Sequence, residues 1–229
     1  MRRLGAALAG LLLAGVLPSC GSPAAAGSGY RLPWPGETSF RVLQGPLVVD
    51  PLGACSSGCG SHRDQDGQHA WDFDLPEGTQ VLAARSGTVG LAVGSWSADH
   101  CGGLTPVADQ PPGYLVSQTM GNQANLVQID HGDGTSALYL HLSSVDPAVE
   151  AKARTSAPVA RGEVLGRSGK TGLTGCLPHL HFQVEKTVRA DWYTTSLPIS
   201  FTDPDVLARN PDGVPAEGGT YVSSNRPAP

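Results

Sequence analysis

The residues of this chain that point most directly to chemistry are two histidines, His179 and His181, in the segment LPHLHFQV. Alternate residues of a β-strand lie on the same face of its sheet. If this segment is a strand, both imidazoles reach one site, with Leu180 and Phe182 packed behind them. The pair alone fits a polar strand face equally well, so the residues that could complete a site decide between the two interpretations.

A second segment supplies a carboxylate and two more histidines. Asp72 lies on a short predicted strand, and His69, three residues earlier, faces the opposite side of that strand. His62 lies in a preceding loop, where alternation sets no direction. His62, Asp72 and His181 would together offer two nitrogens and one oxygen and leave a fourth position open. That is the pattern of a catalytic zinc site and not of a structural one.

The elements expected to hold these residues are short β-strands. Glycine and proline are abundant, at 30 and 19 residues, which favours turns over long helices. Apolar runs between turns predict strands at 81–84, 87–93, 125–129, 137–142 and 179–184. Residues 126–142 read as a hairpin and residues 146–155 as a short helix. The expected fold class is therefore mainly β, a compact antiparallel sheet with few short helices.

The N-terminus carries an export signal. Arg2 and Arg3 precede an apolar run that ends at Leu17, shorter than the ~20 residues of a spanning helix and typical of a signal peptide. The sequence LPSC that ends at Cys20 resembles the lipobox of bacterial lipoproteins. It implies that residues 1–19 are a lipoprotein signal peptide and that Cys20 is lipidated, with an ordinary cleaved signal as the alternative. We expect an exported, membrane-anchored protein of the cell envelope, in the outer membrane or periplasm of a diderm host.

Composition divides the rest of the chain into three parts. Residues 20–39 include the small, neutral sequence GSPAAAGSG and are expected to form a tether. Residues 40–205 hold the predicted strands and form the folded domain, with a long loop at 95–123. Residues 206–229 are rich in Pro, Gly and Ser and are expected to be a flexible tail.

Four cysteines remain when Cys20 is assigned to the lipid. An even number in an exported protein predicts two disulfides. Cys55 and Cys59 share the glycine-rich loop GACSSGCG and are the pair we expect, which leaves Cys101 with Cys176. A zinc ribbon is the alternative, but that site usually needs two closely spaced cysteine pairs.

The charge of the chain argues against a nucleic-acid partner. The net charge is −5, and Lys and Arg cluster nowhere beyond the first three residues. Nucleic-acid binding normally requires a basic patch. We therefore expect no nucleic-acid partner, and we expect a monomer.

Four blocks resemble, in their order, the lysostaphin-like, LytM-type zinc endopeptidases. They are SHRDQDGQHAWDFDLPEGTQVLAARSGTV, NLVQIDHGDGTSALYLHLSSV, ARGEVLGRSGKTG and LPHLHFQV, and they extend over roughly 61–185. The resemblance implies a LytM-type antiparallel β-sheet domain with a groove. It also implies hydrolysis of peptide bonds in peptidoglycan, with peptidoglycan peptides as the partner.

The resemblance also implies roles for individual residues. Asp72 and His181 fall on the family's metal ligands, with Zn²⁺ as the cofactor. His179 and His141 fall on the two histidines that flank the attacking water. We expect His179 to be the general base and His141 to stabilise developing charge, although the two could exchange roles. Asn125 is expected either to line the groove or to cap the start of its strand.

The chain departs from the family pattern at the first metal ligand. Many members carry a histidine four residues before the aspartate, where this chain has Gln68. A subgroup carries it in a Ser-His loop before the strand, which favours His62 over His69.

Two alternatives to an active zinc endopeptidase remain. Some relatives of this domain have lost metal ligands and activate other cell-wall hydrolases without cleaving anything themselves. A purely structural lipoprotein is the other alternative, and it would make the ordered histidines a coincidence. Because this chain has a candidate residue for every expected metal-ligand and catalytic position, the sequence favours the active enzyme.

Overall fold

The computed structural model describes residues 29–46, 62, 66–97, 105–106, 115–116, 123–188 and 192–226. The predicted lipidation site Cys20 and the cysteines Cys55, Cys59 and Cys101 lie outside these residues, as does most of the predicted loop 95–123. Within the described ranges, no helix is long and apolar enough to cross a membrane.

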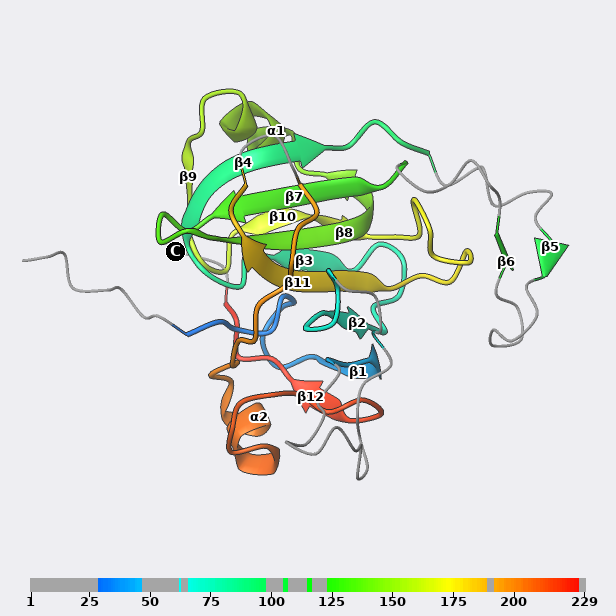
Figure 1. Cartoon of the computed structure of the whole chain (residues 1–229), viewed down its shortest axis with the longest axis vertical. Coiled ribbons are helices and arrows are strands. Elements are labelled where there is room, and N and C mark those ends of the chain that lie inside the picture. The colour runs from blue at the N-terminus through cyan, green and yellow to red at the C-terminus, as the bar shows by residue number, and fades with distance from the viewer. Residues whose placement is uncertain are drawn as a thin grey trace, which may run out of the picture.

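Antiparallel strands form most of the described chain (Figure 1). In chain order, the elements are β1 (Ser39–Gln44), β2 (Trp71–Phe73), β3 (Gln80–Leu82), β4 (Gly87–Val93), β5 (Thr105–Pro106), β6 (Leu115–Val116), β7 (Asn125–Asp130), β8 (Thr135–Val145), α1 (Pro147–Ala153), β9 (Pro158–Val159), β10 (Val164–Ser168), β11 (Leu180–Lys186), α2 (Pro204–Arg209) and β12 (Thr220–Val222). The main sheet has the order β12-β1-β2-β11-β8-β7-β4-β9, with β10 paired to β3 and β8, and β5 pairs with β6 separately. The predicted mainly antiparallel β fold is confirmed.

The strongest sequence patterns became the central strands. The β7–β8 hairpin, β4 and β11 lie where the apolar runs predict them, within a few residues at each end. The short helix is α1, whose N-cap Asp146 accepts a hydrogen bond from the backbone N–H of Ala148. The sequence did not predict β10, because its five residues include a glycine and an arginine and hold few apolar side chains.

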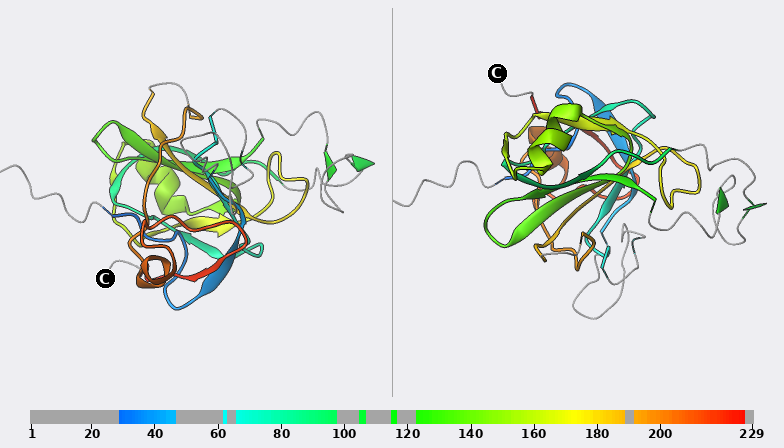
Figure 2. Two further views of the ribbon diagram at one scale, coloured as in Figure 1. Left: turned by 60° about the horizontal axis from the view of Figure 1, so that its bottom comes forward. Right: turned by 90° about the horizontal axis from the view of Figure 1, so that it is seen from above.

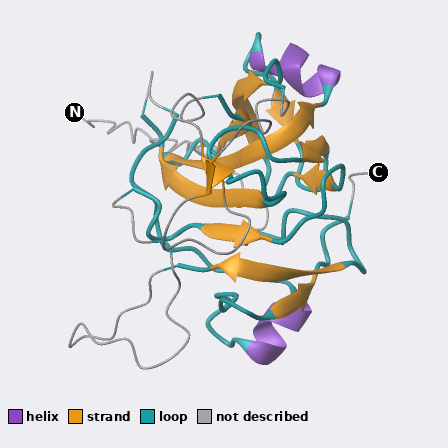
Figure 3. Cartoon of the chain, turned by 90° about the vertical axis from the view of Figure 1, so that its right-hand side faces the viewer, coloured by secondary structure: helices purple, strands orange, loops and turns teal. Residues whose placement is uncertain are grey.

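The central strands bury one face in the main core, and their other face holds polar groups and a smaller apolar cluster of Ala124, Leu126, Leu138 and Leu140. On β11, Leu180, Phe182 and Val184 belong to the main core cluster. His181 alternates with them and lies on the opposite face. The two helices lie at opposite ends of the molecule, α1 beside β4 and α2 beside β12 (Figures 2 and 3). Neither position covers His181, so strands and loops alone must build its site.

The two ends of the described chain belong to the folded domain, which corrects two expectations. In the predicted tether 20–39, Tyr30, Leu32 and Trp34 are buried in the main core. In the predicted tail 206–229, β12 pairs with β1, and Tyr221 is buried. Both errors have the same physical cause. Turn-forming residues dominate these segments, but a few large apolar side chains among them supply enough buried surface to order the chain.

A buried carboxylate joins these two terminal segments. Asp203 is fully buried, and its Oδ2 accepts a hydrogen bond of 2.8 Å from the backbone N–H of Leu32. Its Oδ1 accepts two more from Ser224, one from the backbone N–H at 2.6 Å and one from the hydroxyl at 2.7 Å. The carboxylate therefore links residues that are far apart in the sequence.

We predict that Asp203→Ala lowers the free energy of unfolding by about 2–3 kcal/mol, because it leaves buried donors without their charged acceptor. Urea denaturation of the purified domain measures this change. Asp74→Ala is the matched control, since Asp74 is an exposed aspartate, and it should stay within about 0.5 kcal/mol of the wild type. Equal stabilities of the two variants would contradict the linking role of Asp203.

Candidate metal centre

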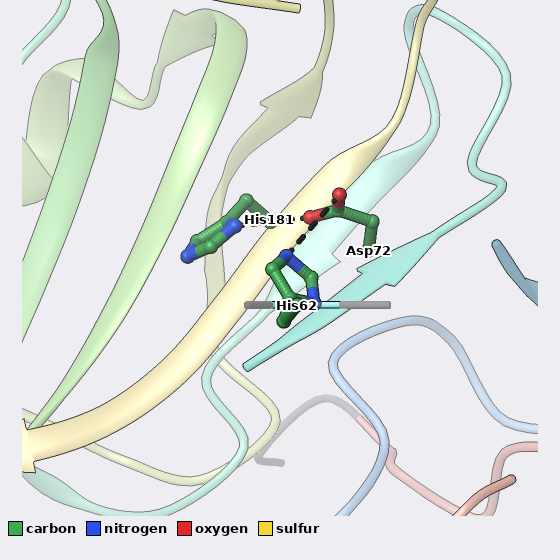
Figure 4. A group of neighbouring side chains, drawn as sticks. All are labelled: His62, Asp72 and His181. Carbon is green, nitrogen blue, oxygen red and sulfur yellow. Dashed lines mark hydrogen bonds and ion pairs between the residues drawn. The ribbon is translucent and has the colours of Figure 1, made fainter. Parts of the chain in front are cut away.

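Three buried side chains converge on one point: His62, Asp72 and His181. One ligand atom from each lies within 4.8 Å of the others. His181 Nδ1 is 2.9 Å from Asp72 Oδ1, and His62 Nε2 is 3.4 Å from Asp72 Oδ2 (Figure 4). The exposed fractions of the three residues are only 6–8%. Two imidazole nitrogens and a carboxylate in a buried cluster form a donor set that suits a divalent transition metal.

Strand pairing explains why two of these residues meet. β2 and β11 are antiparallel neighbours, and Asp72 lies directly opposite His181 in their register. Side chains at opposite positions project from the same face about 5 Å apart. Trp71 and Phe73, which flank Asp72, turn into the main core. The carboxylate therefore projects onto the same face as His181.

The two candidate first ligands, His62 and His69, lie in different environments. The backbone N–H of His62 donates to the carbonyl of Gly45, next to β1, and its side chain enters the cluster. His69 is half-buried and is not part of the cluster, and its backbone N–H donates to the hydroxyl of Ser196. The structure therefore brings His62, and not His69, to Asp72 and His181.

The histidines set the charge of Asp72. Burial raises the pKa of its carboxyl group, but the charge of His179 and hydrogen bonds from His181 and His62 outweigh burial. Together they hold the pKa of Asp72 well below its ordinary value. The cluster thus keeps a buried negative charge beside imidazole nitrogens, as a site for a cation requires.

The other two predicted site residues, His141 and His179, lie beside this cluster. The ring of His141 is 4.8 Å from the ring of His179 and 5.9 Å from that of His181. His179 Nε2 is 3.8 Å from Asp72 Oδ1. His179 precedes β11 and is fixed by its backbone N–H, which donates to the carbonyl of Gly169. All five predicted metal and catalytic residues therefore share one site.

A β-bulge turns His141 toward the site. β8 pairs with β11 as far as Leu140 and with β10 from Leu142 onward, and His141 is the extra residue between them. Without the bulge, alternation would place His141 on the core face with Tyr139. Its φ of +68° is a left-handed conformation that side chains other than glycine adopt at a cost. This strain is located at a predicted catalytic residue.

Backbone carbonyls fix the protonation of both flanking histidines. His141 Nδ1 is 2.8 Å from the carbonyl oxygen of Thr171, and His179 Nδ1 is 2.9 Å from that of Leu177. A carbonyl oxygen only accepts, so each Nδ1 must carry the proton and donate it. In the neutral ring, the lone pair is then on Nε2. Both histidines can accept a proton from a molecule bound at the site.

Burial keeps His141 neutral. It lowers the pKa of the ring, and the electrostatic effect of the neighbouring His179 and His181 lowers it further. Asp72 and the hydrogen bond to the carbonyl of Thr171 oppose them only in part. The pKa of His141 therefore lies well below its ordinary value of ~6.5. Near neutral pH, Nε2 of this ring is therefore unprotonated and can accept a hydrogen bond but cannot donate one.

Asn125 stabilises the backbone next to His141. It is fully buried, its amide bonds both the N–H and the carbonyl of Trp96, and its Nδ2 also donates to the carbonyl of Leu142. The hydroxyl of Thr171 donates to that same carbonyl at 2.8 Å. Asn125 thus fixes the backbone of Leu142, which follows His141, and the backbone of the exposed Trp96. Its side-chain amide is occupied by these hydrogen bonds.

The segment that supplies both carbonyl acceptors contains Cys176, which is disulfide-bonded. The other cysteines lie outside the described residues, so its pairing with Cys101 stays a prediction. Nothing in the sequence indicates that Thr171 and Leu177 orient the flanking histidines, because both act through backbone carbonyl groups.

We predict that His141→Gly is more stable than His141→Ala by about 1 kcal/mol. Glycine normally destabilises a strand relative to alanine, but at φ +68° an L-residue pays about 1–2 kcal/mol that glycine avoids. Urea denaturation of the two variants measures the difference. If the alanine variant is the more stable one, the left-handed conformation at this position is wrong.

We also predict a pH dependence that originates at His141. Because the pKa of His141 is lower in the folded protein than in the unfolded chain, the unfolded chain binds the proton first as the pH falls. Stability is therefore lost below about pH 6.5, by up to about 1.4 kcal/mol per pH unit. In metal-free protein, His141→Gln should lose less stability than the wild type between pH 7.5 and 5.5. Equal losses would contradict a neutral, buried His141.

Comparisons with known proteins identify the family of this chain. The model of Peptidase family M23 matches residues 66–191, more than half of the 229 residues, and His62 lies just before the match. No curated protein matches the chain. Similar solved structures are the catalytic domain of the prophage-encoded M23 protein EnpA from Enterococcus faecalis (17% identity, 71% of this chain, 93% of that chain, TM-score 0.42), lysostaphin (23%, 69%, 48%, 0.38) and a zinc containing peptidase from Vibrio cholerae (22%, 68%, 36%, 0.40). The predicted family is confirmed: this chain belongs to peptidase family M23.

Proposed function

We propose that this protein is a zinc-dependent endopeptidase that hydrolyses peptide bonds in peptidoglycan and so remodels the cell wall. One observation carries the proposal. A buried set of two imidazole nitrogens and a carboxylate lies beside two further histidines whose Nε2 atoms can accept protons. Membership of peptidase family M23 supports peptide hydrolysis. The substrate class rests on the resemblance of the four sequence blocks to LytM-type enzymes.

The three residues that would hold the zinc ion are His62, Asp72 and His181. Three protein ligands leave a coordination position open, as catalytic zinc sites do. When bound, zinc supplies Lewis acidity, which lowers the pKa of water and polarises a carbonyl group. Asp72 stays ionised because the surrounding histidines hold its pKa low, so the ligand set keeps its negative charge at neutral pH.

The two flanking histidines would move the proton. Burial keeps the ring of His141 neutral, so its Nε2 would be free to accept the proton of the attacking water. His179, when it carries a second proton on Nε2, would donate it to the charge that develops on the peptide group. This assignment exchanges the roles that we expected from the sequence, and the digestion of muropeptides by variants of each histidine tests it.

The location of the protein follows from its N-terminal sequence. A signal peptide over residues 1–19 and a lipid on Cys20 would hold the domain at a membrane of the cell envelope, where peptidoglycan is within reach. A single catalytic domain is sufficient for this chemistry, so we propose that the protein acts as a monomer.

The test is metal analysis of the purified domain together with digestion of muropeptides. We predict about one zinc per wild-type chain and release of shorter peptides. His62→Ala should lose the zinc, whereas the matched control His69→Ala should keep it. His141→Ala and His179→Ala should keep the zinc, and cleavage should fall by at least about 100-fold because general acid–base catalysis contributes that much.

Three other results would decide against the proposal or part of it. A wild-type domain without stoichiometric zinc at neutral pH would contradict the enzyme. Loss of zinc from the His69 variant alone would contradict the choice of first ligand. Zinc binding without cleavage, combined with stimulation of another cell-wall hydrolase, would identify a regulatory LytM-type module instead.

A further inference from the structure

The strand face that carries His181 continues into an apolar surface. On β8, Leu140 lies opposite His181 and Leu138 lies opposite Gln183, so the two leucines share the face of the candidate metal site. Both leucines belong to the smaller apolar cluster and are buried. His181 therefore lies at the border between a polar site and an apolar surface.

Two aromatic residues that follow β11, Trp192 and Tyr193, lie on this apolar surface. Both pack against the smaller apolar cluster of β7 and β8, and the centroids of their rings are 5.9 Å apart. The segment that follows β11 passes in front of these two strands (Figure 1). Both residues are half-buried, whereas the leucines beneath them are buried. This aromatic pair, Trp192 and Tyr193, therefore presents part of its surface on the face of the candidate metal site.

The ring of Tyr193 is next to the candidate metal ligands. Its centroid is 6.2 Å from that of His181, nearly as close as the 5.9 Å that separates the rings of His141 and His181. An extended peptide advances about 3.3 Å per residue. A residue that flanks a peptide bond held at His181 therefore lies within reach of the Tyr193 ring. The family match ends at residue 191, so the aromatic pair lies just beyond it.

A buried carboxylate fixes the segment that carries the aromatic pair. Glu185 has no exposed surface, and its Oε2 accepts a hydrogen bond of 2.8 Å from the backbone N–H of Thr194, the residue after Tyr193. Gln183 Nε2 donates to the same oxygen at 2.8 Å and to the carbonyl of Thr194 at 3.3 Å. The hydroxyl of Thr194 donates to the carbonyl of Lys186 at 2.7 Å. Burial of a carboxylate is costly unless it is bonded, so these bonds hold Thr194 against β11.

We propose that Trp192 and Tyr193 contact the substrate next to the scissile bond and select an uncharged, apolar residue there. Burial of an apolar side chain against the two rings is favourable, whereas a charged side chain would lose hydration. Glu185 is a positioning residue, because it acts through the segment that carries the aromatic pair. The inference rests on the proposed function, which brings a peptide to the candidate metal site.

The first measurement is peptide binding to the metal-free domain, which does not depend on cleavage. An alanine tetrapeptide with both termini blocked is titrated, and the ring protons of Tyr193 are followed by NMR. These signals should shift in the wild type. The dissociation constant should rise at least about fourfold in Tyr193→Ala, the effect of leaving about one methyl group unburied. A peptide with glutamate at both central positions should bind the wild type at least about fourfold more weakly than the alanine peptide.

The second measurement is the selectivity of the zinc-loaded enzyme between the alanine peptide and peptides with glutamate on either side of the scissile bond. In the wild type, kcat/KM should favour alanine at least about 10-fold at one of these positions. Tyr193→Arg should abolish or reverse the preference there, because a guanidinium group pairs with a carboxylate. A ratio of two substrates measured on one variant does not change when that variant is merely less stable.

Two matched controls separate substrate contact from packing. Phe40→Ala also removes a half-buried aromatic ring, but this ring packs against the main core, so the variant should lose stability and keep the wild-type selectivity. Glu185→Met removes the acceptor of the Thr194 N–H and should lose selectivity while it keeps its zinc. Gln128→Met removes only a 2.8 Å bond to the other carboxylate oxygen, Oε1, and should keep both.

Each outcome supports or overturns the proposal. Tyr193 signals that do not shift with millimolar peptide overturn it, as does wild-type selectivity in Tyr193→Arg. Equal losses of selectivity in the Phe40 and Tyr193 variants would show that packing is responsible. Wild-type selectivity in Glu185→Met would contradict the positioning role. If the wild type binds no zinc, the proposed function fails, and peptide binding to the metal-free domain still decides whether the aromatic pair contacts peptides.

Discussion

The pairing of β2 with β11 is the constraint on which the site depends. It sets Asp72 opposite His181, and the core residues on either side of each leave them one face on which to project. A shift of one residue in either strand would turn the ligand of that strand, Asp72 or His181, into the core. The aromatic and aliphatic packing beneath β2 and β11 therefore fixes the distance between a carboxylate and an imidazole. Metal binding needs that distance but could not enforce it alone.

The rest of the site is built from departures from regular structure. His141 reaches it only through the bulge where β8 changes partner from β11 to β10. The close approach of Gly169 to β8 accompanies this change, since a side chain there would have its Cβ 2.4 Å from the backbone nitrogen of Ser143. The main-chain carbonyls of Thr171 and Leu177 then orient the two flanking rings. Regular strand pairing supplies the ligands Asp72 and His181, whereas a bulge and the segment before β11 supply the proton-transfer groups His141 and His179.

This division explains how much the sequence could predict. Strand alternation placed His181 and Asp72 correctly, because a period of two holds wherever one face is buried. The same rule puts His141 on the wrong face, and only the family resemblance placed it at the site. The terminal segments were misjudged because burial of Tyr30 and Tyr221 depends on contacts between distant parts of the chain. Composition in a local window contains no information about such contacts.

Gln183 and Glu185 show that a signal can be present and still be overlooked. They continue the alternation of His181, and an uninterrupted polar face on a strand that is otherwise apolar is visible in the sequence HFQVEK. What the sequence cannot supply is their burial, which changes the meaning of the pattern. On an exposed face, these polar side chains would only contact water. Buried beside His181, Gln183 and Glu185 must satisfy every donor and acceptor, and the carboxylate of Glu185 therefore fixes the direction in which the amide of Gln183 is turned.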